Sequence, residues 1–178
     1  MNPTDMLTTL FSEERCMKPT DTLTTLFSHH LWANLRLLER CAELTDEQME
    51  ATISGTFGSI HATLQHIVRS EQSYFSRIST GQRYSRPADA LPMTIAEMIE
   101  AARTTGTGLI EWASKVQAND TVRIDWDGTP RDVPKTIILT QVINHATEHR
   151  EQVKTILTQL GIEPPDLQSW AYFDEMDQ

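Results

Sequence analysis

The chain has 178 residues, 39% of them hydrophobic, and a formal net charge of −10, which suits one domain with a buried core. Its acidity argues against binding of nucleic acid, which depends on basic patches, and no apolar run reaches the roughly 18–20 residues of a membrane span. The N-terminus lacks a basic segment followed by an apolar one, and the two cysteines, Cys16 and Cys41, are too few for a disulfide framework. We therefore expect a cytoplasmic protein with reduced thiols whose partner is a small molecule, with no nucleic acid and no membrane.

A segment near the N-terminus occurs twice. Residues 3–12 (PTDMLTTLFS) recur as residues 19–28 (PTDTLTTLFS) with one mismatch. On one continuous helix this offset would turn the two Leu/Phe stripes to nearly opposite sides, and Pro19 would interrupt the helix. We interpret residues 1–16 as a duplicated extension outside the core, Met17 as an original start, and residues 17–178 as a single domain. Deletion of residues 1–16 is expected to leave the fold intact.

Four stretches carry apolar residues at the three- and four-residue spacing of an amphipathic helix. The predicted helices run from about 21 to 41, 59 to 78, 94 to 116 and 135 to 160. Thr94-Ile95-Ala96-Glu97 has the pattern of a capping box at the start of the third helix, and Gly161 suits the end of the fourth. Between residues 121 and 134, β-prone residues beside Asp127-Gly128 predict a small hairpin or extended excursion. The expected fold is all-α, a four-helix bundle with this excursion before its last helix.

The last predicted helix carries two histidines, His145 and His149, four residues apart. This spacing places them on one face with about 5–6 Å between their Cβ atoms, within reach of one metal ion. Val142 and Val153 fall on the same stripe, so the pair faces the core, where ionisable rings require a partner. Taken alone, the pair fits a metal site about as well as it fits two solvated or hydrogen-bonded histidines.

A third metal ligand is expected on the second helix, which holds His61 and His66. The two lie on opposite flanks of the apolar stripe, and His66 shares its side with small residues that let a neighbouring helix approach. This favours His66 over His61. Glu71 falls near the centre of the apolar face, where an unpaired carboxylate is costly. It is expected either to hydrogen-bond a ligand imidazole or to pair with Arg150.

Two motifs carry a resemblance to a known family. Residues 64–71 (LQHIVRSE) and 145–152 (HATEHREQ) together resemble the DinB/YfiT-like superfamily of bacterial four-helix metalloproteins. Trp32-Ala33-Asn34 and Trp170-Ala171-Tyr172 are similar to its usual opening and C-terminus. The resemblance covers roughly residues 17–173 and leaves out the duplicated segment.

The resemblance implies a fold, a metal site and a reaction class. The fold would be an up-down-down-up bundle that forms a homodimer, and His66, His145 and His149 would bind a divalent metal. Several relatives resemble thiol-dependent S-transferases and isomerases that use bacillithiol or mycothiol. A low-molecular-weight thiol is therefore an expected cosubstrate.

Three neutral imidazoles leave a metal with an open position, as in catalytic sites. Such a metal lowers the pKa of bound water to about 7 or holds a thiol as thiolate. We therefore expect a metal-activated thiol to attack an electrophilic substrate, with Arg83 and Arg86 of the following loop available to a carboxylate of that thiol. The identity of the metal is not determined by these ligands, because imidazole suits Zn, Ni, Fe and other divalent ions such as Mn or Cu.

Two other classes of function fit the same residues. In a metal-dependent hydrolase, bound hydroxide would be the nucleophile and Glu71 or Glu148 would serve as the base. In a non-catalytic metal-binding or stress-response protein, the metal would only stabilise the bundle.

Overall fold

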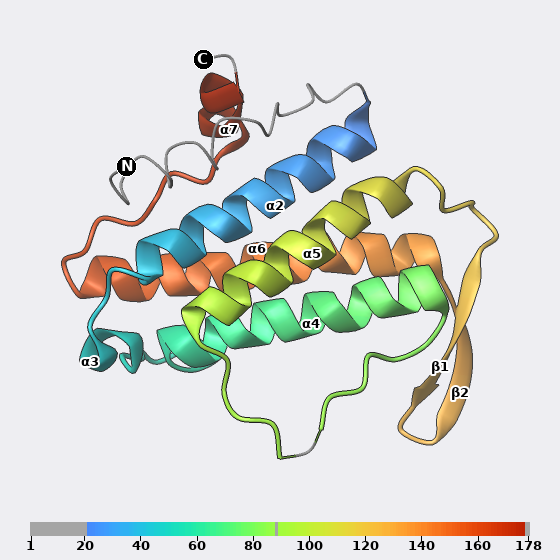
Figure 1. Cartoon of the computed structure of the whole chain (residues 1–178), viewed down its shortest axis with the longest axis horizontal. Helices are drawn as coiled ribbons and strands as arrows, with labels where there is room; N and C mark the ends of the chain where they lie inside the picture. Colours follow the sequence, from blue (N-terminus) through green and yellow to red (C-terminus); the bar gives the residue numbers. More distant parts are fainter. Residues whose placement is uncertain (1–20, 88, 177–178) are drawn as a thin grey trace, which may run out of the picture.

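Four long helices lie side by side and form the body of the molecule (Figure 1). The computed structural model describes residues 21–87 and 89–176, so the duplicated segment 1–16 lies outside the described residues. The elements in chain order are α2 (Thr22–Cys41), α3 (Asp46–Met49), α4 (Ile60–Thr80), α5 (Ile95–Ala113), β1 (Thr121–Trp126), β2 (Thr129–Pro134), α6 (Lys135–Gln159) and α7 (Ser169–Met176). The prediction of a mostly helical chain is confirmed.

Local sequence signals account for most helix ends. The side chain of Asp21 accepts a hydrogen bond from the Thr24 amide at the start of α2, and Ser59 caps α4 in the same way. Thr94 and Glu97 form the predicted capping box of α5. Gly161 follows α6 with a φ of 72°, a left-handed conformation that glycine adopts without strain. The helix bounds therefore fall within a few residues of the predicted ones.

The third helix ends earlier than expected. α5 stops at Ala113, three residues before the predicted end at 116. A turn takes over there, in which the Lys115 amide donates to the Trp112 carbonyl at 3.0 Å. Apolar spacing alone extended the prediction into this turn.

The long helices pack in a closed ring. α2 packs chiefly on α5, α5 on α4, α4 on α6, and α6 completes the ring by contacting α2. Figure 1 shows that α2 and α6 run in one direction and that α4 and α5 run in the other. Among the described helices, none is long and apolar enough to cross a lipid bilayer.

The segment before α6 is a β-hairpin. β1 and β2 pair antiparallel, with Trp126 opposite Thr129 at the two-residue turn. Asp127 and Gly128 both have positive φ, which is the backbone that a tight hairpin turn of this length requires. The predicted hairpin is thus confirmed. Val122 of β1 is buried against the helices, so the hairpin packs on the body of the molecule.

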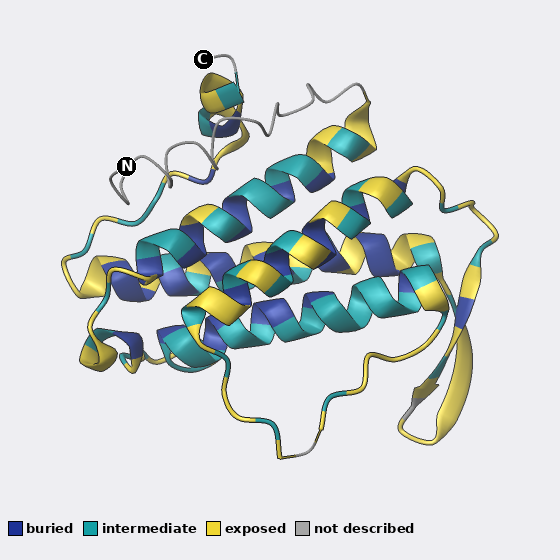
Figure 2. Ribbon diagram, in the orientation of Figure 1, coloured by how far each residue is buried: buried dark blue, intermediate teal, exposed yellow. Residues whose placement is uncertain are grey.

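Two apolar clusters fill the interior, where the buried faces of the long helices meet (Figure 2). One cluster includes Leu37, Leu38, Leu64, Val68, Met98, Val153 and Ile156. The other includes Phe27, Ile78, Leu109, Ile138 and Val142. Between them, each long helix contributes a buried polar residue: His30 from α2, Glu71 from α4, Thr105 from α5 and Arg150 from α6. The core therefore contains a polar layer between two apolar ones.

Candidate metal centre

Three histidines from two helices meet at one point. α4 supplies His66, while α6 supplies His145 and His149 one turn apart. Each offers a ring nitrogen, and these nitrogens all lie within 4.8 Å of one another. The Nε2 atoms of His66 and His145 are 2.9 Å apart. An ion that binds imidazole nitrogens at about 2.1 Å holds neighbouring ones about 3–3.5 Å apart, so this group, the histidine cluster, could hold a single metal ion.

The surroundings keep two rings of the cluster, His66 and His145, in the form that binds metal. Burial, followed by the charges of His149 and His66, lowers the pKa of His145 to about 4. Burial and His149 also lower the pKa of His66. Metal binding requires the unprotonated ring, and rings with such lowered pKa values are unprotonated at neutral pH.

A glutamine orients one of the three rings. Nδ1 of His149 donates to Oε1 of Gln152 at 2.9 Å, and the amide of Phe57 donates to the same oxygen at 3.1 Å. Because Nδ1 then carries the proton, Nε2 of His149 keeps its lone pair for a ligand. Gln152 lies within the motif at 145–152, but its role was not predicted.

Two aromatic residues border the cluster and were also missed as site residues. Phe57 stacks on His66 with 4.1 Å between ring centroids and meets His149 edge-on at 5.3 Å. Tyr74 meets His145 edge-on at 5.8 Å. Phe57 lies between two glycines in a stretch without regular periodicity, and Tyr74 falls on the apolar stripe of its helix. Neither position signals a metal site in the sequence.

Glu71 has partners other than the histidine cluster. It is 3% exposed, and its Oε2 accepts hydrogen bonds from His30 Nε2 at 2.7 Å and from Asn34 at 2.9 Å. Its Oε1 accepts from Thr105. These contacts are to α2 and α5, so the expected hydrogen bond to a ligand imidazole is not among them.

Arg150 is linked to Glu71 through the same residues. Its Nη1 donates to Asn34 Oδ1 at 2.8 Å and approaches His30 Nδ1 at 3.5 Å. A neutral His30 that donates from Nε2 to Glu71 can accept from Arg150 at Nδ1. Burial lowers the pKa of Arg150 to about 10, and the charge of Glu71 opposes this shift. We call the set His30, Asn34, Glu71, Thr105 and Arg150 the buried network.

The remaining described histidines lie apart from the cluster. His61 is placed 2.9 Å from the carbonyl of Met93 through Nε2, and His29 lies 2.8 Å from the carbonyl of Leu167. Each ring nitrogen donates to that backbone oxygen. The structure therefore brings His66, and not His61, to the pair on α6.

Known proteins share the fold that carries these residues. The DinB family model matches residues 17–176. The crystal structure of a DinB-like protein from Bacillus subtilis is similar with a TM-score of 0.57 and 14% identity, over 80% of this chain and 97% of that chain. A DinB-like protein from Bacillus cereus has a TM-score of 0.56 and 20% identity, over 79% of this chain and 91% of that chain. At these identities the two likenesses concern the fold alone, and the comparison with curated proteins gave no significant match. The match over nearly the whole chain shows that the protein belongs to the DinB family.

Proposed function

We propose that the protein is a metal-dependent enzyme that activates a low-molecular-weight thiol, such as bacillithiol or mycothiol, for S-transfer or isomerisation. The observation that carries this proposal is the convergence of His66, His145 and His149. These residues would hold a divalent ion such as Zn, Ni, Fe or Mn. When bound, that ion would supply Lewis acidity that lowers the pKa of a thiol.

The chain's own residues prepare the site. Gln152 holds His149 in the tautomer with a free Nε2. Phe57 stacks on one face of the His66 ring. The three rings are half-buried, so a small molecule can approach the remaining side.

The thiol has to come from a small molecule. Cys41 is the described cysteine, and burial raises the pKa of its thiol to about 12. A buried thiol with so high a pKa is a poor nucleophile at neutral pH. This favours a cosubstrate thiol over a cysteine of the protein in the described part of the chain.

The position of the carboxylates disfavours hydrolysis. The group of possible ligands contains three histidines and no carboxylate among the described residues. Glu71 is occupied by the buried network, and Glu148 is exposed on α6. A hydrolase that relies on a side-chain base needs a carboxylate near its water, whereas a thiol that has lost its proton to become a thiolate needs none.

Three further predictions belong to this proposal. The ring of α2, α5, α4 and α6, with its opposed directions, supports an up-down-down-up four-helix bundle. The homodimer and the cytoplasmic location stay predictions, and sedimentation of the purified protein tests the dimer.

Thiol transfer can be measured directly. Metal-loaded protein is incubated with bacillithiol, mycothiol or glutathione and with monochlorobimane, and conjugate fluorescence is followed. We expect turnover with one of these thiols, its loss in His66→Ala/His149→Ala, and its retention in His61→Ala. Turnover of esters without a thiol would replace the proposal with a hydrolase. Inertness in both assays, with a large fall in melting temperature on chelation, would replace it with a structural metal site.

A further inference from the structure

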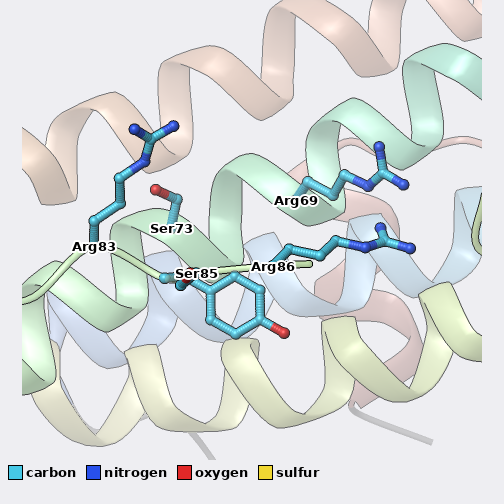
Figure 3. Close-up of a pocket in the computed structure, with 6 residues that line it drawn as sticks. Arg69, Ser73, Arg83, Ser85 and Arg86 are labelled. Carbon is cyan, nitrogen blue, oxygen red and sulfur yellow. The ribbon is translucent and has the colours of Figure 1, made fainter. Parts of the chain in front are cut away.

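A cavity with three arginines lies beside α4. Its volume is about 560 Å³, a size typical of sites for small organic molecules. The residues that line it are Arg69 and Ser73 of α4 with Arg83, Tyr84, Ser85 and Arg86 of the segment that follows this helix (Figure 3). We call this cavity the arginine pocket. Figure 3 shows Arg69 and Arg86 extending in the same direction, with Arg83 beside Ser73 at the other end.

The described residues that line the pocket carry three positive charges and no carboxylate, although the whole chain carries a net charge of −10. Within residues 21–87 and 89–176, Arg69, Arg83 and Arg86 take part in no ion pair, in contrast to Arg36, Arg40 and other arginines of the chain. Hydrogen bonds with Thr94 have the largest effect in lowering the pKa of Glu97, and the charge of Arg86 also helps to lower it. The Glu97 carboxylate accepts a hydrogen bond from the Thr94 amide in the capping box.

Arg86 donates a hydrogen bond to the carbonyl of Leu91, and two further observations concern Arg69. The Nε atom of Arg69 is buried and has no hydrogen-bond partner, which is costly for a charged group. Burial and the nearby charge of Arg86 lower the pKa of Arg69, so the two guanidinium groups repel each other. An anion between them would relieve both penalties, since guanidinium binds carboxylate and phosphate oxygens in pairs.

The pocket continues the side of α4 that bears the histidine cluster. Arg69 and Ser73 follow His66 by three and seven residues, a spacing that keeps all three on one side of a helix. At 1.5 Å per residue, these positions lie about 5 and 10 Å farther along the helix axis. One small molecule can therefore span the distance between the two sites.

We propose that the arginine pocket binds the carboxylate or phosphate end of a small organic anion whose other end reaches the histidine cluster. Arg69, Arg83 and Arg86 bind the anionic group, and the hydroxyl groups of Ser73 and Ser85 supply further donors. Anion binding follows from the pocket alone. The identity of this molecule as the substrate or thiol of the reaction rests on the proposed function.

Anion binding can be tested without metal or turnover. Metal-free full-length protein is titrated with inorganic phosphate and, separately, with succinate by calorimetry at low ionic strength. We expect one of the two to bind, and the tighter one identifies the anionic group as phosphate or carboxylate. Arg69→Gln and Arg83→Gln/Arg86→Gln should each weaken binding by about tenfold or more. Arg123→Gln, which removes the same charge from the exposed hairpin, should leave it unchanged.

These measurements test anion binding by the arginine pocket separately from thiol transfer at the histidine cluster. Absence of binding up to roughly 10 mM of either anion, or equal binding by the arginine variants and the wild type, would overturn the pocket. Arg83 is exposed, so Arg83→Gln alone keeps the test valid if Arg69→Gln fails to fold. Anion binding by His66→Ala/His149→Ala supports the pocket even if no thiol transfer is found. In active protein, the arginine variants should raise KM with little change in kcat. An unchanged KM would show that the pocket does not bind the substrate or thiol of the reaction.

Discussion

The interior of the molecule holds two polar groups of opposite character. The buried network contains five side chains, each at most 5% exposed and each with a hydrogen-bond partner inside the protein. The histidine cluster is half-buried, and two of its three rings face each other through nitrogens of the same kind. Every member of the first group has a protein partner, whereas in the second group His66 and His145 bring the Nε2 atoms that a metal could share within 2.9 Å of each other.

The difference separates a structural role from a binding role. Buried polar groups persist in a core when every donor and acceptor is paired, as in the network that links all four long helices. A half-buried set of three imidazoles without a carboxylate adds little to the stability of the fold. It gains much from an ion that three nitrogens can share. Both groups contain histidine, so the residue type alone does not distinguish the two roles.

Removal of the network's carboxylate should produce the largest change in stability. In Glu71→Ala, Arg150 loses its counter-charge, and His30, Asn34 and Thr105 lose an acceptor in the core. We expect the free energy of unfolding to fall by about 3–5 kcal/mol, measured by urea denaturation. Glu148→Ala removes an exposed carboxylate and should change it by less than about 0.5 kcal/mol. Similar losses in both variants would contradict a special role for the network.

Removal of cluster histidines should act on metal and not on the fold. In His66→Ala/His149→Ala, affinity for a divalent ion should fall by at least about 100-fold, measured by metal analysis and competition with a chelator. The free energy of unfolding of the metal-free protein should stay within about 1 kcal/mol of the wild type, because these rings are half-buried. His61→Ala serves as the control on the same helix. Unchanged metal content in the double variant would reject the site.

Helical periodicity explains how much of this could be predicted from the sequence. It located the four long helices and placed His66 and Glu71 on flanking or inward positions, because these depend only on spacing within one helix. It could not match Glu71 with His30 or Phe57 with His66. Those pairs form between different helices or between a loop and a helix, so they depend on the tertiary packing.

A smaller effect is expected from the residue that orients the cluster. Gln152→Leu removes the acceptor for His149 Nδ1, so the ring is free to turn and to change tautomer. We expect metal affinity to fall by about 10–100-fold with all three ligands present. Gln152→Glu keeps an acceptor at this position and should restore binding. Equal affinity in Gln152→Leu and the wild type would show that the packing of Phe57 holds the ring by itself.

The smallest expected effect is a dependence of stability on acidic pH that comes from the histidine cluster and not from the buried network. In metal-free protein, His145 has a pKa of about 4, against 6.5 for the free side chain, so between these values the unfolded chain binds more protons than the folded one. The free energy of unfolding then falls as pH drops through this window and is fully present above it. Its loss should be on the order of 1 kcal/mol, since solvent screens a half-buried ring. His145→Asn should flatten this slope in chemical denaturation from about pH 7 to 5, whereas Arg150, with a pKa of about 10, stays charged throughout. An unchanged slope in His145→Asn would place the acid sensitivity elsewhere in the chain.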